Sequence, residues 1–222
     1  MIEIKKLSKS FDSNWNKVNI FKNLELDIKT GDFISIVWTS WSWKTTFLNM
    51  LSWIDNDYKW EIFIDSINFT SLDDSKKTEF RWKNISYIFQ NFRLVDNLTV
   101  WENVDLIVEL NNLERNYKTD DILKIVWLYD KKETYVFNLS WWESQRVAIA
   151  RAFVWKTSLL LADEPTWSLD ISNKKIIMDL IVKLHDDIKN TIIMITHDDE
   201  IAKMASKVYN ITNNNLLRIK NV

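Results

Sequence analysis

One glycine, Gly31, serves a chain of 222 residues, and this scarcity constrains the fold more than any other feature of the sequence. Tight turns and close backbone contacts normally use glycine, because it adopts positive φ angles without a steric penalty. A chain of this length would hold about 15 glycines at average usage. Tryptophan, in contrast, occurs 13 times. Either the turns are made in an unusual way, or glycine has been written as tryptophan.

The rest of the composition is that of a globular protein. With 46% hydrophobic and 27% charged residues, the chain is neither disordered nor fibrous, and its length allows one large or two small domains. The absence of cysteine excludes a disulfide framework and a thiolate metal site. A formal net charge of -2 argues against a nucleic-acid partner. No apolar run approaches the roughly 20 residues that span a bilayer, so we expect contact with a membrane only through a partner.

Short β-branched runs alternate with amphipathic helical patterns along the chain. The runs at 34–37, 85–89, 159–162 and 192–195 are nearly continuous, as in parallel strands that are buried on both faces. The helical patterns cover residues 45–51, 71–81, 100–110, 119–126, 143–154, 172–187 and 199–205. This order predicts an α/β fold with a largely parallel sheet. Because residues 91–154 are almost purely helical, we expect a helical subdomain there, inserted into a core of 1–90 and 155–222 within a single domain.

The strand at 34–37 is followed by the most informative motif. It reads Trp38-Thr39-Ser40-Trp41-Ser42-Trp43-Lys44-Thr45-Thr46, and an apolar helix comes next. With glycine at each tryptophan, the segment becomes GTSGSGKTT, which fits the phosphate loop G-x-x-x-x-G-K-[ST] in its strand–loop–helix context. In such a loop, backbone N–H groups surround the phosphates at a helix N-terminus. Three indoles would fill the space of the nucleotide.

The same exchange restores two further motifs. Residues 139–146 become LSGGESQR, and residues 162–170 become ADEPTGSLD. With these motifs the chain resembles, from end to end, the ATP-binding subunit of an ABC transporter, most closely the lipoprotein-release, macrolide-export and cell-division type. The resemblance implies a P-loop NTPase (RecA-like) fold, with a mostly parallel sheet and N-terminal antiparallel strands. It also implies ATP and Mg²⁺ as cofactors.

At least ten of the tryptophans stand where this family accommodates glycine, Trp60, Trp127 and Trp155 among them. Trp15 and Trp101 fit less clearly. Some bacterial lineages read the UGA codon as glycine, whereas a commoner variant code reads it as tryptophan. We therefore hypothesise that glycine UGA codons were written as tryptophan. A protein made with the printed residues would neither bind nor hydrolyse ATP.

The resemblance assigns a role to five residues at one nucleotide site. Lys44 contacts the β- and γ-phosphates, and Thr45 places its hydroxyl on Mg²⁺ with Thr46 nearby. Asp163 is the carboxylate on the magnesium side. Glu164 is the general base that polarises the attacking water.

Three more residues complete this site in the resemblance. Gln90 matches the glutamine that contacts Mg²⁺ and water, and His197 matches the histidine that hydrogen-bonds the γ-phosphate. Phe11 matches the aromatic residue that stacks on adenine, although a core position explains it equally well. His185, in a charged helical pattern, is expected to be exposed.

The signature motif implies a second copy of the chain. Ser140, Trp141, Trp142 and Glu143 would contact the γ-phosphate of a nucleotide held by the opposite subunit, at a helix N-terminus. Asp170 would cross the interface. We therefore expect a head-to-tail dimer with two ATP molecules. The other expected partner is a membrane-spanning permease, which places the chain in the cytoplasm on the inner face of the cell membrane.

Three functions remain open at this point. The first is an ATPase that powers transport, and the second is an ATP-switched scaffold of the cell-division type. The third is a tryptophan-rich protein that stacks bases or sugars on its indoles, which requires that the tryptophans are real. The transported substrate and the direction of transport depend on the permease, so this chain does not determine them.

Overall fold

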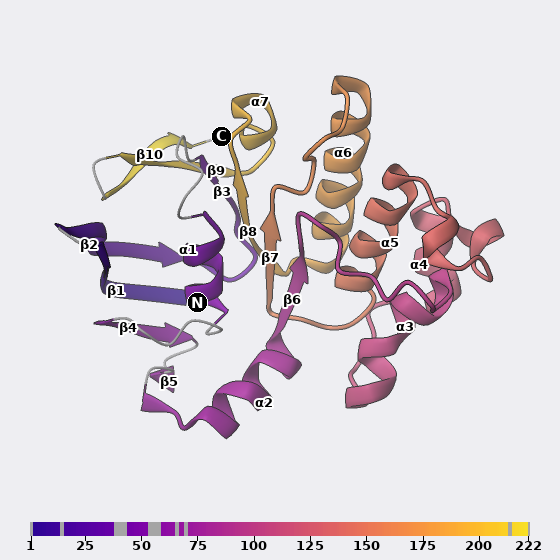
Figure 1. Cartoon of the computed structure of the whole chain (residues 1–222), viewed down its shortest axis with the longest axis horizontal. Helices are drawn as coiled ribbons and strands as arrows, with labels where there is room; N and C mark the ends of the chain where they lie inside the picture. Colours follow the sequence, from indigo (N-terminus) through magenta and orange to yellow (C-terminus); the bar gives the residue numbers. More distant parts are fainter. Residues whose placement is uncertain are drawn as a thin grey trace. The chain divides into compact units, whose positions relative to one another are not determined.

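The computed structural model describes residues 2–13, 16–37, 44–52, 59–64, 67–68, 71–212 and 215–221. The chain divides into two compact units, residues 1–81 with 191–222 and residues 82–190 (Figure 1). Six residues of the predicted phosphate loop lie outside the described part of the chain: Trp38, Thr39, Ser40, Trp41, Ser42 and Trp43.

The first unit carries the N-terminal antiparallel sheet, which has the strand order β2-β1-β4-β5. Its strands are β1 (Ile2–Ser13), β2 (Asn16–Ile28), β4 (Lys59–Ile64) and β5 (Ile67–Asn68). The single glycine lies between β2 and the next strand, where the turn requires positive φ: Gly31 has φ 81° and donates to Thr191 Oγ1 at 3.2 Å. This is the left-handed region, in which glycine carries no steric penalty.

Parallel strands form the other sheet of the first unit. β3 (Phe33–Val37) lies between β8 (Thr191–Thr196) and β9 (Lys207–Thr212) and is parallel to both. β10 (Asn215–Asn221) pairs antiparallel with β9. Every residue of β3 and β8 is buried, as the continuous apolar runs predict for strands covered on both faces. This unit contains helices α1 (Lys44–Leu51) and α7 (Asp199–Ala202) and most of α2 (Asp74–Asn84).

The second unit has two parallel strands, β6 (Ile85–Ile88) and β7 (Leu159–Asp163). Its helices are α3 (Val100–Asn111), α4 (Thr119–Ile125), α5 (Trp141–Phe153) and α6 (Ile171–Ile188), with short 3₁₀ helices η2 (Tyr129–Lys131) and η3 (Val136–Asn138). Helix α2 (Asp74–Asn84) leads into β6. Figure 1 shows α3, α4 and α5 grouped together, and α3 and α4 both contact α5.

Helix α4 ends in a hydrogen-bond pattern that normally uses glycine. The N–H of Leu128 donates to the carbonyl of Leu123 at 2.8 Å, and the N–H of Trp127 donates to the carbonyl of Lys124 at 3.1 Å. These two bonds make a Schellman motif, whose C′ residue adopts a left-handed conformation. Trp127 occupies that position with φ 55°, and its side chain is 60% exposed.

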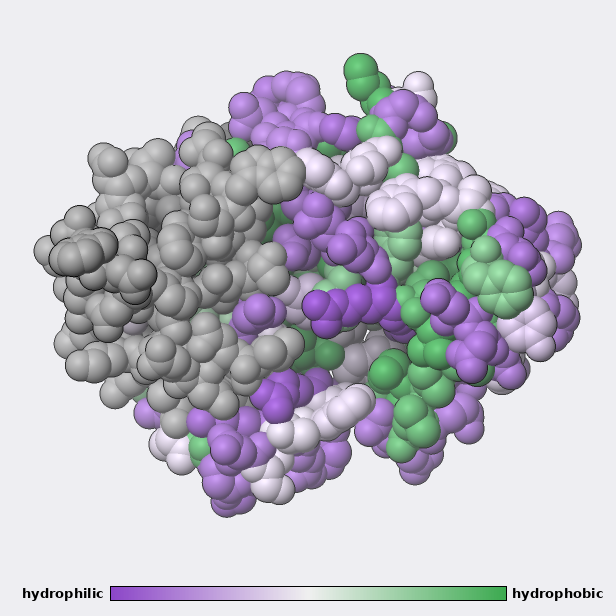
Figure 2. Space-filling model, viewed as in Figure 1, coloured by the Kyte–Doolittle hydropathy of each residue, from purple (hydrophilic) through white to green (hydrophobic). Residues whose placement is uncertain are grey.

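Large hydrophobic side chains remain exposed on the second unit. In Figure 2 hydrophobic residues gather over part of the helical region. Ile171 is 87% exposed and Leu110 is 70% exposed. None of the described helices is long and apolar enough to cross a membrane.

The predicted α/β fold, with a parallel sheet and N-terminal antiparallel strands, is confirmed. The long strand β2 was not predicted, because its alternation is interrupted by polar residues. The prediction for His185 was wrong: α6 turns this residue inward, beside Leu184, and only 8% of it is exposed. Burial lowers the pKa of His185. The boundaries predicted for a helical subdomain at 91 and 154 stay a prediction.

Candidate functional site

Two predicted segments leave the parallel sheet of the first unit at the same edge. Val37, the last residue of β3, lies opposite Thr196, the last residue of β8. The phosphate loop follows Val37, and His197 follows Thr196 directly. Residues 44–46 form the first turn of α1. The side chains of Lys44, Thr45 and Thr46, like that of Phe11 in β1, lie outside the described part of the structure.

The second unit brings three predicted residues to the carboxyl edge of its parallel strands. Ile88 at the end of β6 pairs with Ala162 in β7, so Gln90 and Asp163 leave the sheet close together. Asp163 is 6% exposed and Glu164 is 4% exposed, while Gln90 is half-buried in a turn. Ligands of open α/β sheets bind outside this edge.

The backbone at Glu164 is unusual. Its φ of 47° lies in the left-handed region, which costs a non-glycine residue about 1 kcal/mol or more. A turn holds it there, because its carbonyl accepts from the N–H of Trp167 at 2.9 Å. Burial raises the pKa of Tyr87 in β6, and the nearby negative charge of Asp163 raises it further. The turn after β7 and the burial of both side chains therefore fix two acids, Asp163 and Glu164, at the end of this strand.

Arg151 of α5 holds the loop that follows Gln90. Its guanidinium donates to the carbonyl of Arg93 at 2.7 Å and to the carbonyl of Phe92. Phe92 and Arg93 have φ values of 49° and 50°, so two successive non-glycine residues are left-handed. Burial lowers the pKa of Arg151 to about 10. The loop that follows Gln90, here called the glutamine loop, is thus anchored to α5, the helix that begins with the signature motif of residues 139–146.

The signature helix begins with a capping box. Ser140 is the N-cap of α5, and its Oγ accepts from the N–H of Glu143. Glu143 Oε2 accepts in return from the N–H of Ser140 at 2.9 Å and from its hydroxyl at 2.8 Å. Lys131 of η2 donates to the other oxygen, Glu143 Oε1. The hydrogen bond from Lys131 has the largest effect on the pKa of Glu143, and the bonds from Ser140 act in the same direction. Together they lower this pKa to about 2, so the carboxylate is charged at neutral pH.

Two indoles lie in the first turn of α5. Trp141 is 46% exposed, and its ring centroid lies 4.4 Å from that of Phe92 in the glutamine loop. The guanidinium of Arg146 lies over the Trp142 ring at 5.4 Å from its centroid. Arg146 also donates to the carbonyls of Val126 and Trp127, which joins α5 to the end of α4.

Asp170 is the exposed N-cap of α6. Its Oδ1 accepts from the N–H of Asn173 at 2.9 Å, and this bond lowers the pKa of the carboxyl. Ser168, two residues earlier, is left-handed with φ 62°. The segment between β7 and α6 is therefore a tight turn that presents Asp170 to solvent.

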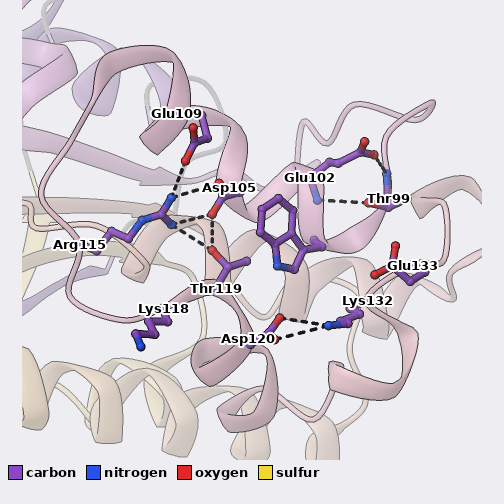
Figure 3. A pocket seen from close by; sticks show the side chains of 11 residues that line it. Thr99, Glu102, Asp105, Glu109, Arg115, Lys118, Thr119, Asp120, Lys132 and Glu133 are labelled. Carbon is purple, nitrogen blue, oxygen red and sulfur yellow. Dashed lines mark hydrogen bonds and ion pairs between the residues drawn. The ribbon is translucent and has the colours of Figure 1, made fainter.

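The second unit also contains a charged cavity of about 690 Å³, shown in Figure 3. Asp105 of α3 is 2% exposed and accepts from Arg115 through both carboxylate oxygens and from Thr119. Burial alone raises the pKa of Asp105, but the bonds from Arg115 and Thr119 outweigh it and leave that pKa lowered. Arg115 also contacts Glu109. This network ties α3 to the start of α4.

No cluster of three or more His, Asp or Glu side chains that could hold a metal ion by themselves occurs in the described ranges. Sequence reasoning missed Lys131, Arg146 and Arg151. Arg151 left a signal, because it interrupts the apolar run of residues 147–153. Lys131 left none, since its contact with Glu143 depends on how η2 packs against α5.

Comparison with known proteins places the chain in a family. The family model described as "ABC transporter" matches residues 21–167. The ABC transporter ATP-binding protein MJ0796 of Methanocaldococcus jannaschii is 34% identical over 94% of this chain and 92% of its own. The lipoprotein-releasing system ATP-binding protein LolD of Buchnera aphidicola is 34% identical over 95% of this chain and 93% of its own.

Two further matches extend this likeness. The macrolide export ATP-binding/permease protein MacB of Neisseria gonorrhoeae is 33% identical over 98% of this chain, which spans 34% of MacB. A solved dimeric structure of MJ0796 in a post-hydrolysis state, bound to ADP and Pi, superposes with a TM-score of 0.86 and 31% identity, over 99% of this chain and 98% of that one. The chain belongs to the ABC transporter family, as one of its ATP-binding ATPase subunits.

Proposed function

We propose that this chain supplies the ATP-hydrolysing site of a membrane transporter of the lipoprotein-release and macrolide-export type. The observation that carries the proposal is the edge of β6 and β7, where Gln90, Asp163 and Glu164 leave two parallel strands. Glu164 is buried and held in a strained conformation, as is common for residues of active sites.

In the proposed reaction, a water molecule attacks the γ-phosphorus of ATP. Glu164 accepts a proton from this water as the new P–O bond forms, and the bond to the ADP oxygen breaks. Lys44 and His197 stabilise the charge that develops on the γ-phosphate. His197 suits this role, because the end of β8 lies beside the end of β3, where the phosphate loop begins.

The described residues fit a magnesium ion. Asp163 and Gln90 offer a carboxylate and an amide oxygen at one edge, and oxygen ligands are those that Mg²⁺ prefers. Few protein ligands suffice, because Mg²⁺ is usually completed by water and substrate phosphates. We assign Asp163, Gln90 and the Thr45 hydroxyl to this site. Bound Mg²⁺ would neutralise charge on the phosphates.

A second copy of the chain would complete each site. Ser140, with the backbone of residues 141–143, would bind the γ-phosphate held by the partner, and Asp170 would reach across the interface. The exposure of Ser140 and Asp170 supports this assignment. The MJ0796 cassette was solved as a dimer. Phe11 would stack on adenine.

The transmembrane partner would be a permease. This chain matches only about a third of MacB, whose printed name joins an ATP-binding part to a permease. We propose that the chain works from the cytoplasm, on the inner face of the cell membrane, together with a membrane-spanning permease. The substrate would be determined by that permease.

We further propose that most of the tryptophans are glycine in the native product. The φ of 55° at Trp127 supports the exchange, because the C′ position of a Schellman motif is usually glycine. The first turn of the signature helix supports it too, since glycine at 141 and 142 would expose the backbone N–H groups that an anion needs. An intact mass of the native protein near 26.7 kDa would contradict the exchange, whereas a lower mass by one tryptophan–glycine difference per position is expected.

The activity is tested with two chains that carry equal numbers of exchanges. One has glycine at the six motif positions 38, 41, 43, 141, 142 and 167, and the other has glycine at 15, 53, 60, 82, 127 and 155. We expect Mg²⁺-dependent ATP hydrolysis only from the first chain, because only it frees the space for phosphates. Equal activity of the two chains, or of the printed chain, would contradict the proposed exchange. A folded chain with glycine at all 13 positions but no ATPase activity would contradict the proposed function.

A further inference from the structure

A negative charge lies at the place where the signature motif is expected to receive a phosphate. Glu143 is the third residue of α5, and only 15% of its side chain is exposed. A carboxylate there stabilises the free helix, because it complements the positive end of the helix dipole. The same charge repels an incoming triphosphate at close range. A site that contains this glutamate therefore needs a compensating cation.

Lys131 provides that cation from outside the motif. It ends η2, twelve residues before Glu143, and its side chain is 50% exposed. Its ammonium contacts Oε1 of Glu143, while the N–H and hydroxyl of Ser140 use Oε2. The two oxygens of the Glu143 carboxylate thus have different hydrogen-bond partners. One belongs to the capping box, and the other carries the ion pair.

The neighbouring cations are engaged elsewhere. Lys132 donates to both oxygens of Asp120 at 3.4 Å and lies over the Tyr129 ring. Arg146 donates to the carbonyls of Val126 and Trp127. Neither makes a described hydrogen bond to Glu143. Arg146 lies close enough to interact with the charge of Glu143, but of these three cations only Lys131 makes a described hydrogen bond to the carboxylate.

We propose that Lys131 is a positioning residue of the composite nucleotide site: it neutralises Glu143, so that the N-terminus of α5 accepts the γ-phosphate of an ATP bound to the second copy. The inference rests on the proposed function and deepens it. The ion pair with Lys131 holds the Glu143 carboxylate where it accepts the hydrogen bonds of Ser140. Ser140 thereby remains the N-cap of α5. The local charge near the phosphate then comes from backbone N–H groups.

A double-mutant cycle separates this role from general stabilisation. The variants are Lys131→Gln, Glu143→Gln and both together, made in the chain with glycine at all 13 tryptophan positions and with Glu164→Gln to slow hydrolysis. The measured quantity is the ATP concentration that gives half-maximal dimerisation in sedimentation experiments. We expect Lys131→Gln to raise it about tenfold when Glu143 is present, within the range of coupling between contacting residues. In the Glu143→Gln background the amide still forms a capping box. There Lys131→Gln should raise the half-maximal ATP concentration less than about threefold.

The matched control is Lys132→Gln, which removes the same charge one residue away. It should change the half-maximal ATP concentration less than about threefold in either background, because Lys132 contacts Asp120 instead. The effect of Lys131→Gln should also shrink as salt screens the carboxylate. Melting temperatures without nucleotide should stay close together, since the half-exposed ammonium of Lys131 remains accessible to water and its ion pair adds little to stability.

The outcomes distinguish the two proposals. A parental chain that does not dimerise with ATP would overturn the proposed function, and the role of Lys131 with it. The parental chain could instead dimerise, while Lys131→Gln raises the half-maximal ATP concentration by the same factor with Glu143 and with Gln at position 143. This result would overturn the role of Lys131 alone. A loss from Lys132→Gln as large as that from Lys131→Gln would also overturn it.

Discussion

At the scale of single residues, the backbone of Trp127 has a conformational strain that glycine would avoid. Its φ of 55° is left-handed, and its indole is 60% exposed, so little burial offsets the strain. In the printed chain, Trp127→Gly should therefore raise the free energy of unfolding by about 1 kcal/mol. Urea unfolding followed by circular dichroism measures the change.

Trp82→Gly is the matched control, because Trp82 is also exposed, at 46%, but lies within helix α2. Glycine is a poorer helix former than tryptophan, so this exchange should lower the free energy of unfolding by about 0.5 kcal/mol. Two changes of the same chemistry then have opposite signs. Destabilisation by both would show that Trp127 carries no backbone strain.

At the scale of elements, Arg151 joins the glutamine loop to α5 through the carbonyls of Phe92 and Arg93. Arg151→Met keeps a long apolar stem but leaves both carbonyls without their donor. It should lower the free energy of unfolding of the glycine chain by about 2 kcal/mol. The rate of ATP hydrolysis should fall as well, because Gln90 lies at the start of the released loop. Denaturant unfolding and a phosphate-release assay measure the two effects.

Lys156→Gln supplies the comparison for Arg151. Lys156 pairs with Glu114, and both side chains are largely exposed, at 63% and 72%. Loss of such a pair should change stability by less than about 0.5 kcal/mol and leave hydrolysis unchanged. If Arg151→Met behaves like Lys156→Gln, the loop does not depend on this anchor.

The elements also show how far the sequence alone could reach. Asp163 and Glu164 were predicted from the resemblance of residues 162–170 to a family motif that follows an apolar strand, and the structure places both buried at the end of β7. The left-handed φ of Glu164 was not predicted, because it depends on the turn that Glu164 forms with Trp167. Lys131 could not be predicted, because its contact with Glu143 arises only when η2 packs against α5. The strand β2 was missed because polar residues interrupt its alternation, and only its pairing with β1 shows that residues 16–28 form one strand.

At the scale of the whole molecule, a head-to-tail dimer would share each nucleotide site between two copies. Lys44→Ala should disable the phosphate loop, and Ser140→Arg should block the signature motif. Either variant alone should be inactive. An equal mixture should regain about a quarter of the parental activity, because half of the random dimers contain one intact composite site of two. Phosphate release from mixed glycine chains measures this recovery.

The control for this experiment is a mixture of Lys44→Ala with Glu164→Gln. Both changes lie on the phosphate-loop side of the same site, so one site in each mixed dimer keeps Lys44 but lacks the base, and the other has the base but lacks Lys44. This mixture should stay inactive. Recovery there would exclude a site composed in the proposed way.

The contact between Trp141 and Phe92 has an optical consequence. In the printed chain, an indole at the start of α5 lies against the loop that follows Gln90, with ring centroids 4.4 Å apart. A chain with glycine at the other 12 tryptophan positions would have a single tryptophan, Trp141, placed at the junction of these two motifs. Its emission colour would then report whether the loop and the helix stay together or separate.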